Sequence, residues 1–154
     1  MKVYKINTKI IVPTDIISCW DFFSNPFNLE KLTPGEVFLK IDLTESEPIY
    51  PGMLISYIVK PFRNLQFNWL TEITAVQKNR YFIDEQRFGP YKFWHHQHTF
   101  KPVRGGVEIA DEVNYVLPFG ILGRILHPII VKTKLEEIFN YRNRQIEKIF
   151  NYGK

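Results

Sequence analysis

Three side chains in this sequence are well suited to chemistry: His96, His98 and Asp111. An imidazole beside a carboxylate can act as an oriented general acid or base, or as a polar anchor for a bound small molecule. The same residues could instead form a satisfied buried pair that only holds two strands in register. The three could also offer nitrogen and oxygen ligands to zinc. The predicted strand pairing places no fourth ligand nearby, so we expect no metal and no other cofactor.

The segment Lys101-Pro-Val-Arg-Gly-Gly106 predicts the turn of a β-hairpin that extends over residues 89–120. Its glycines permit the positive φ angles of a tight turn between two β-rich stretches. If Phe100 faces Val107, antiparallel pairing places His96 beside Asp111. Most residues on that face are apolar, so we interpret it as the interior face. A slip of one residue would turn the whole set outward.

Other candidate ligand-binding residues come from the remaining strands and the last helix. Alternation or helical spacing directs these side chains inward, and they are Tyr57, Trp69, Trp94, Tyr115, Phe139 and Arg142. The aromatic rings could line a cavity or pack as ordinary core, and the Tyr115 hydroxyl adds a polar group. Arg142 could pair with an acidic ligand group, with Asp111 or with another strand carboxylate. The register across Gly89-Pro90 is ambiguous, so Asp84, Glu85 and Arg87 are not assigned to the cavity.

Hydrophobic periodicity and turn residues predict an α+β fold with one long terminal helix. We expect a strand over residues 3–12, a short helix capped by Thr14 or Asp15 that ends near Phe23, and a second short helix over residues 27–31. Strands should follow over residues 37–43, 53–59, 66–76 and 81–88, before the hairpin. Residues 60–64 are predicted to be a loop that carries Phe62. A helical turn over residues 121–127 should precede a helix over residues 128–150, in which Pro128 is either a kink or the first residue.

Composition narrows the class of protein. The chain has 154 residues, which suits a single domain over residues 1–154, and 16% of them are aromatic, which favours a large core or a lined cavity. A net charge of +4 without a basic cluster argues against nucleic-acid binding. One cysteine, Cys19, excludes an internal disulfide and suits a reducing compartment. With no signal peptide and no membrane-spanning stretch, we expect a soluble, cytoplasmic protein.

The order of elements and a set of short motifs resemble the helix-grip fold of the START and pollen-allergen superfamily. The similarity is greatest to its small bacterial members that are called cell-division-inhibitor-like. The motifs that carry it are Asn25-Pro26-Phe27-Asn28-Leu29, Leu32-Thr33-Pro34, Gly89-Pro90-Tyr91, Trp94-His95-His96-Gln97-His98-Thr99-Phe100, Asp111-Glu112-Val113-Asn114-Tyr115, Leu117-Pro118-Phe119-Gly120 and Ile138-Phe139-Asn140-Tyr141-Arg142. The resemblance implies a curved seven-stranded antiparallel sheet around the last helix, with a hydrophobic cavity between them. It does not imply a single activity.

Three hypotheses follow from these observations. The first is a carrier or sensor that binds a small hydrophobic molecule, with no nucleic-acid or integral-membrane partner. The second is an enzyme of the cyclase or dehydratase type that acts on a polyketide-like or lipid substrate, with His96 as the base and Asp111 as its orienting partner. The third is a protein-interaction module whose core is filled by side chains, with a partner that the sequence does not identify.

Overall fold

The computed structural model describes residues 1–42, 47–62 and 65–151. In these ranges seven antiparallel strands form one sheet in the order β1-β7-β6-β5-β4-β3-β2. The strands are β1 (Tyr4–Val12), β2 (Phe38–Asp42), β3 (Leu54–Phe62), β4 (Leu65–Gln77), β5 (Tyr81–Phe88), β6 (Phe93–Val103) and β7 (Gly106–Val116). The helices are α1 (Ile16–Phe23), α2 (Asn28–Lys31), α3 (Gly120–Leu126), the π-helical turn η1 (His127–Val131) and α4 (Lys132–Asn151).

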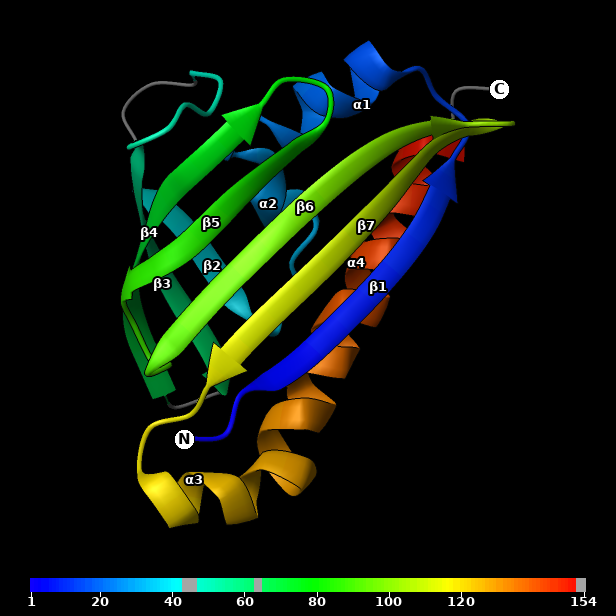
Figure 1. The fold of residues 1–154 in the computed structure, drawn as a ribbon. Coiled ribbons are helices and arrows are strands. Elements are labelled where there is room, and N and C mark those ends of the chain that lie inside the picture. Colours follow the sequence, from blue (N-terminus) through cyan, green and yellow to red (C-terminus); the bar gives the residue numbers. More distant parts are fainter. Residues whose placement is uncertain (43–46, 63–64, 152–154) are drawn as a thin grey trace.

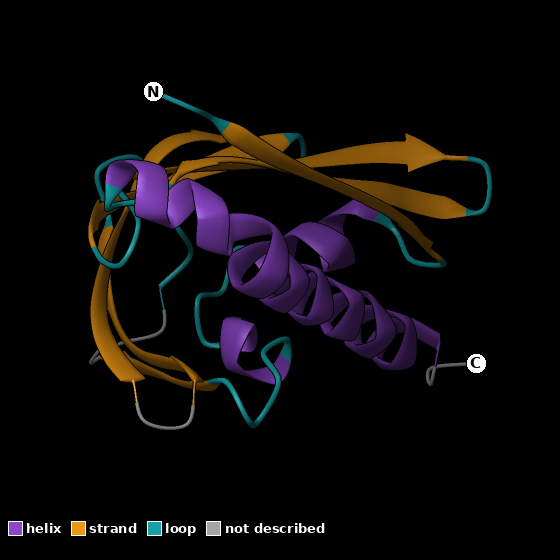
Figure 2. Ribbon diagram, turned by 90° about the horizontal axis from the view of Figure 1, so that it is seen from below, coloured by secondary structure: helices purple, strands orange, loops and turns teal. Residues whose placement is uncertain are grey.

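The sheet curls around the helices, and α4 runs along its concave face (Figures 1 and 2). The sequence of α4 explains this packing, because Leu135, Phe139 and Ile146 recur at helical spacing and are all buried. Asp15 caps α1 as predicted, since its carboxylate accepts the backbone N–H groups of Ile17 and Ser18 at 2.9 Å. None of the described helices is long and apolar enough to cross a membrane.

The predicted helix-grip architecture is confirmed, and two predicted element boundaries are wrong. β3 continues to Phe62, which pairs with Leu65 of β4, so residues 60–62 are strand rather than loop. The turn that follows lies outside the described residues, as does the predicted end of the second strand at Leu43. At the start of the terminal helix, Pro128 lies inside the π-helical turn, and the regular α-helix begins only at Lys132. A proline lacks the N–H that a regular helix interior requires, which accounts for the irregular turn.

The hairpin prediction is correct about which side chains point inward and wrong about which residues pair across the two strands. Phe100 pairs with Ile109 instead of Val107, and His98 rather than His96 is the direct partner of Asp111. The two strands extend closer to the turn than predicted, because only residues 104 and 105 separate β6 from β7. The error amounts to two residues along one strand. A shift of two preserves which side chains point inward, since the side-chain period of a strand is two.

Candidate functional site

A cavity of about 220 Å³ lies between the concave face of the sheet and α4. Its lining comes from β2, β3, β4, β5 and β6, from α1 and the segment around α2, and from α4. Most of the lining is apolar or aromatic. Of the nine residues predicted to contact a ligand, seven line this cavity: Tyr57, Trp69, Trp94, His96, His98, Phe139 and Arg142. Asp111 and Tyr115 do not line it.

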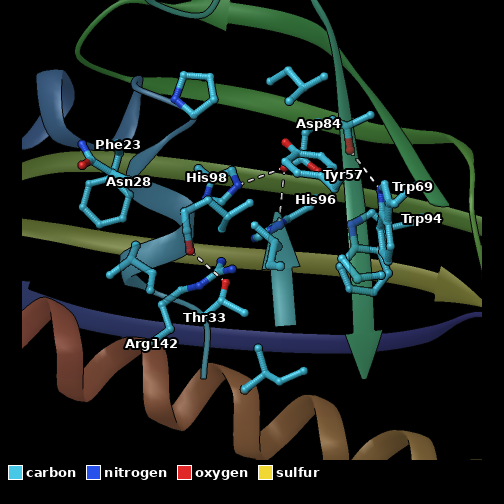
Figure 3. A pocket seen from close by; sticks show the side chains of 18 of the residues that line it. Phe23, Asn28, Thr33, Tyr57, Trp69, Asp84, Trp94, His96, His98 and Arg142 are labelled. Carbon is cyan, nitrogen blue, oxygen red and sulfur yellow. Dashed lines mark hydrogen bonds and ion pairs between the residues drawn. The ribbon is translucent and has the colours of Figure 1, made fainter. Parts of the chain in front are cut away.

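Aromatic rings form one end of the cavity (Figure 3). Trp69 and Trp94 meet edge to face with ring centres 5.3 Å apart, and Tyr91 lies 4.7 Å from Trp94. The Trp69 indole N–H donates to the Thr71 hydroxyl at 3.0 Å, which satisfies its polar atom and fixes the ring. This wall is therefore held rigidly by its own contacts and offers apolar surface to the interior.

Four side chains at the wall of the cavity form a polar cluster, Asp84, His96, His98 and Asp111, which we call the His–Asp cluster. All of them except Asp111 line the cavity. Asp84 Oδ2 lies 3.0 Å from His98 Nε2 and 3.4 Å from His96 Nδ1. On the other side of the rings, Asp111 Oδ1 lies 3.2 Å from His96 Nε2 and 2.7 Å from His98 Nδ1. The His98 contact with Asp111 lacks hydrogen-bond geometry and is electrostatic. Each imidazole thus lies between two carboxylates.

Asp84 is the member of the cluster that the sequence did not identify. β5 pairs with β6 so that Asp84 faces His96 directly. The alternation along β5 could have placed Asp84 on the inner face, because Phe82 is buried and Asp84 lies two residues further on the same face. Glu85, on the opposite face, pairs with His95 at 2.8 Å, as expected for the outer surface.

Burial and the neighbouring charges shift the pKa values of the four groups in the His–Asp cluster. Burial, together with the nearby His98 ring, lowers the pKa of His96. Burial alone would also lower the pKa of His98, but the two carboxylates outweigh it and raise that pKa. The histidines hold the pKa of Asp84 below its usual value and that of Asp111 well below it, against the effect of burial. These opposite shifts favour a proton on His98 over a proton on His96.

Tyr115 belongs to a different cluster. Its hydroxyl lies 2.8 Å from Nε2 of His127, and both side chains are buried. The ring of Tyr4 stacks on His127 with centres 3.5 Å apart. Tyr115 therefore joins the last strand to the π-helical turn before α4, and its hydroxyl is occupied there.

Arg142 extends from α4 into the cavity (Figure 3). Its guanidinium carbon lies 5.1 Å from the centre of the Phe139 ring, and its Nε is buried without a hydrogen-bond partner. Within the described ranges it forms no ion pair, so the predicted alternative of a pair with Asp111 or another strand carboxylate is wrong. Its positive charge still lowers the pKa of Asp84 from a distance.

Part of the His–Asp cluster also has the composition of a metal site. One ligand atom from each of Asp84, His96 and His98 can be chosen so that all three atoms lie within 4.8 Å of one another. Two imidazoles and a carboxylate are a donor set that divalent transition metals accept. The sequence had suggested Asp111 as the third ligand, whereas the structure places Asp84 in that position.

Comparisons with known proteins identify the fold. No protein-family model matches the chain, and no curated protein matches its sequence. Protein CV1439 from Chromobacterium violaceum has a similar structure, with a TM-score of 0.73 and 11% identity over 95% of this chain and 96% of that one. Major latex-like protein 151 from Panax ginseng gives 0.70 and 14% over 96% and 97%. A norcoclaurine synthase point mutant from Thalictrum flavum, solved with a transition-state analogue, gives 0.64 and 14% over 94% of both chains.

These similarities show that the chain has the helix-grip fold, as the resemblance in sequence predicted. At such low identity the shared feature is the fold alone.

Proposed function

We propose that this protein binds a small, mainly apolar molecule in the cavity between the sheet and α4, and that an acidic group of this ligand pairs with Arg142. The cavity is the observation that carries the proposal. Its volume of about 220 Å³ is below the roughly 300–1,000 Å³ of sites for drug-sized molecules, which favours a small ligand. Its aromatic wall would supply apolar burial, which contributes about 25 cal/mol per Å².

Arg142 is the reason to expect an acidic group on the ligand. Arg142 is partly buried, and a buried polar atom costs free energy unless it is hydrogen-bonded. Arg142 has a buried Nε without a partner and no ion pair with any described carboxylate, although it lines the cavity. A carboxylate on the ligand would supply both missing partners through the fork of the guanidinium.

The enzyme hypothesis is the second candidate, and it depends on a free nitrogen of His96. Both ring nitrogens already lie within 3.4 Å of carboxylate oxygens, from Asp84 on one side and Asp111 on the other. A general base needs one nitrogen within hydrogen-bond reach of the substrate. We therefore favour binding over catalysis. The third hypothesis, a core filled by side chains, has less support because of the cavity.

The test compares ligands that differ only in charge. Decanoic acid and 2-naphthoic acid are each measured beside their methyl esters, by quenching of tryptophan fluorescence, since Trp69 and Trp94 line the cavity. Hydrogen bonds to charged groups contribute ~1.5–3 kcal/mol, so the acid should bind about tenfold more tightly or better. In Arg142→Gln this preference should disappear while ester binding remains.

A second pair of variants tests the place of binding. Val59 lines the cavity and its neighbour Ile58 does not, so Val59→Phe should block binding and Ile58→Phe should leave it unchanged. If neither acid nor ester binds, or if Val59→Phe binds as wild type does, the proposal is wrong. Native mass spectrometry of freshly purified protein would reveal a co-purifying ligand directly.

Two finer assignments belong to the same proposal. The motifs in the sequence, such as Trp94-His95-His96, favour the small bacterial cell-division-inhibitor-like group. We treat residues 1–154 as one ligand-binding domain that acts in the cytoplasm, where the single cysteine would stay reduced. Fractionation of cells that express a labelled copy would test the location.

A further inference from the structure

Asp84, His96 and His98 point their polar atoms at one another from two adjacent strands. Asp84 comes from β5, and both histidines come from β6, two residues apart on the inner face. His96 and His98 are buried, and all three residues line the cavity. These atoms therefore share one small volume at the wall of an apolar space.

The spacing of the three atoms suits a metal ion. Zinc binds imidazole nitrogen and carboxylate oxygen at about 2.0–2.2 Å, so neighbouring ligand atoms in a tetrahedral site lie about 3.3 Å apart. Asp84 Oδ2 lies 3.4 Å from His96 Nδ1 and 3.0 Å from His98 Nε2. Small side-chain movements would bring all three atoms to coordination distance.

Asp111 supplies the support that metal-binding histidines need. Such histidines almost always donate their second ring N–H to a carboxylate, a carbonyl or water, which fixes the ring and its tautomer. On the far side of both rings from Asp84, Asp111 Oδ1 lies 3.2 Å from His96 Nε2, within hydrogen-bond reach. The same oxygen lies 2.7 Å from His98 Nδ1 in an electrostatic contact without hydrogen-bond geometry. Thr8 donates to the other oxygen of Asp111 at 3.3 Å and holds this carboxylate in place.

We propose that Asp84, His96 and His98 form a binding site for a divalent transition metal such as zinc, with Asp111 as the residue that orients both imidazoles. A divalent ion balances the charges of the Asp84 and Asp111 carboxylates without a charged imidazole. Three protein ligands leave a coordination position open, and all three proposed ligands line the cavity. The site would present that position to an oxygen atom of a bound small molecule.

The outer face of the same strands provides a matched control. His95 Nδ1 lies 2.8 Å from Glu85 Oε1, so it is also a histidine paired with a carboxylate across β5 and β6. This pair is half-buried on the side of the sheet away from α4, and it lacks a second histidine. A metal that binds any exposed imidazole would bind here too, whereas the proposed site would not involve these residues.

The experiment uses untagged protein that is dialysed against a chelator and then against buffer. Co²⁺ is titrated and read by visible absorption, and Zn²⁺ is added in competition. We expect one ion per chain with the intense bands of four-coordinate cobalt. Asp84→Asn and His98→Gln should weaken binding more than about 100-fold, and Asp111→Asn by about 10–100-fold. His95→Gln should bind as wild type does.

A second measurement works on the wild-type chain, in case a variant fails to fold. The chain has 4 histidines, so the imidazole resonances in a nitrogen-15 NMR spectrum can be followed individually. Zinc should shift the ring resonances of His96 and His98 and leave those of His95 and His127 unchanged. The inference is overturned if binding is not saturable at one ion, if Asp84→Asn retains it, or if the His95 resonances shift as much. No organic ligand is used, so the outcome is independent of the proposed function.

Discussion

His98 and Asp111 face each other as direct partners across β6 and β7, with His98 Nδ1 2.7 Å from Asp111 Oδ1. The same oxygen lies 3.2 Å from His96 Nε2. One buried carboxylate therefore positions both histidines that line the cavity, and it does so without lining the cavity itself. Several properties of the protein should depend on this arrangement and on the contacts that surround it.

Removal of the Asp111 carboxylate should destabilise the fold strongly. Asp111→Ala would leave two buried imidazoles without a partner on one side, and loss of one member of a buried ion pair costs about 3–5 kcal/mol. Urea unfolding at neutral pH measures the change in the free energy of unfolding. The adjacent Glu112 pairs with Lys5 at the surface, so Glu112→Ala should change stability little. Equal effects of the two substitutions would contradict the structural role of Asp111.

The bond between Tyr115 and His127 should depend on pH. Burial and the nearby Lys2 and Lys132 lower the pKa of His127, so the folded state favours the neutral ring that can accept the Tyr115 hydroxyl. A depressed folded pKa contributes stability above the unfolded value, near 6.5, and that stability is lost as the pH falls. Tyr115→Phe should therefore cost about 1–2 kcal/mol at about pH 8 and less at about pH 5.

Urea unfolding of wild type and Tyr115→Phe at both pH values tests this expectation. Ligand affinity should not change in Tyr115→Phe, because the residue does not line the cavity, whereas Tyr57→Phe alters a lining residue. A gap in stability that widens toward acid pH would show that the sign is wrong.

Gly106 should tolerate no side chain. It has a φ of 145°, and a Cβ there would overlap the backbone carbonyl of Val12, which cannot move aside easily. Gly105 has a φ of 94° but open space around it. Gly105→Ala should thus cost about 1–2 kcal/mol, from backbone strain alone. Gly106→Ala should cost more than about 3 kcal/mol. Thermal unfolding of both variants would contradict this account if the order of stability were reversed.

Cys19 should be unreactive in the folded protein. The thiol is fully buried, and burial raises its pKa to about 12 from an ordinary value of 9.0. The reactive thiolate is then about a thousandfold scarcer near neutral pH. A disulfide exchange reagent should react with the native protein far more slowly than with the urea-unfolded protein. Rapid labelling of native protein, with the fold intact by circular dichroism, would place the thiol at an accessible position.

Much of the architecture follows from local sequence. The alternation of Trp94, His96 and His98 with outward residues predicts which face of β6 is interior, and the structure confirms this. The stripe of Leu135, Phe139 and Ile146 likewise predicts the buried side of the last helix. Such patterns depend only on the period of a strand or a helix, which every residue of the element repeats. These patterns can be recognised in the sequence without knowing which strands pair with each other.

The partners of the polar groups depended on the tertiary structure. Hairpin register is set by the two-residue turn, and it paired Asp111 with His98 rather than with His96. The register between β5 and β6 brought Asp84 to the histidines, while Arg142 pairs with no carboxylate in the part of the chain that the structure describes. A sequence fixes the face of each side chain through local geometry. Which residue lies opposite depends on pairing between strands, and that is decided only when the whole sheet closes around α4.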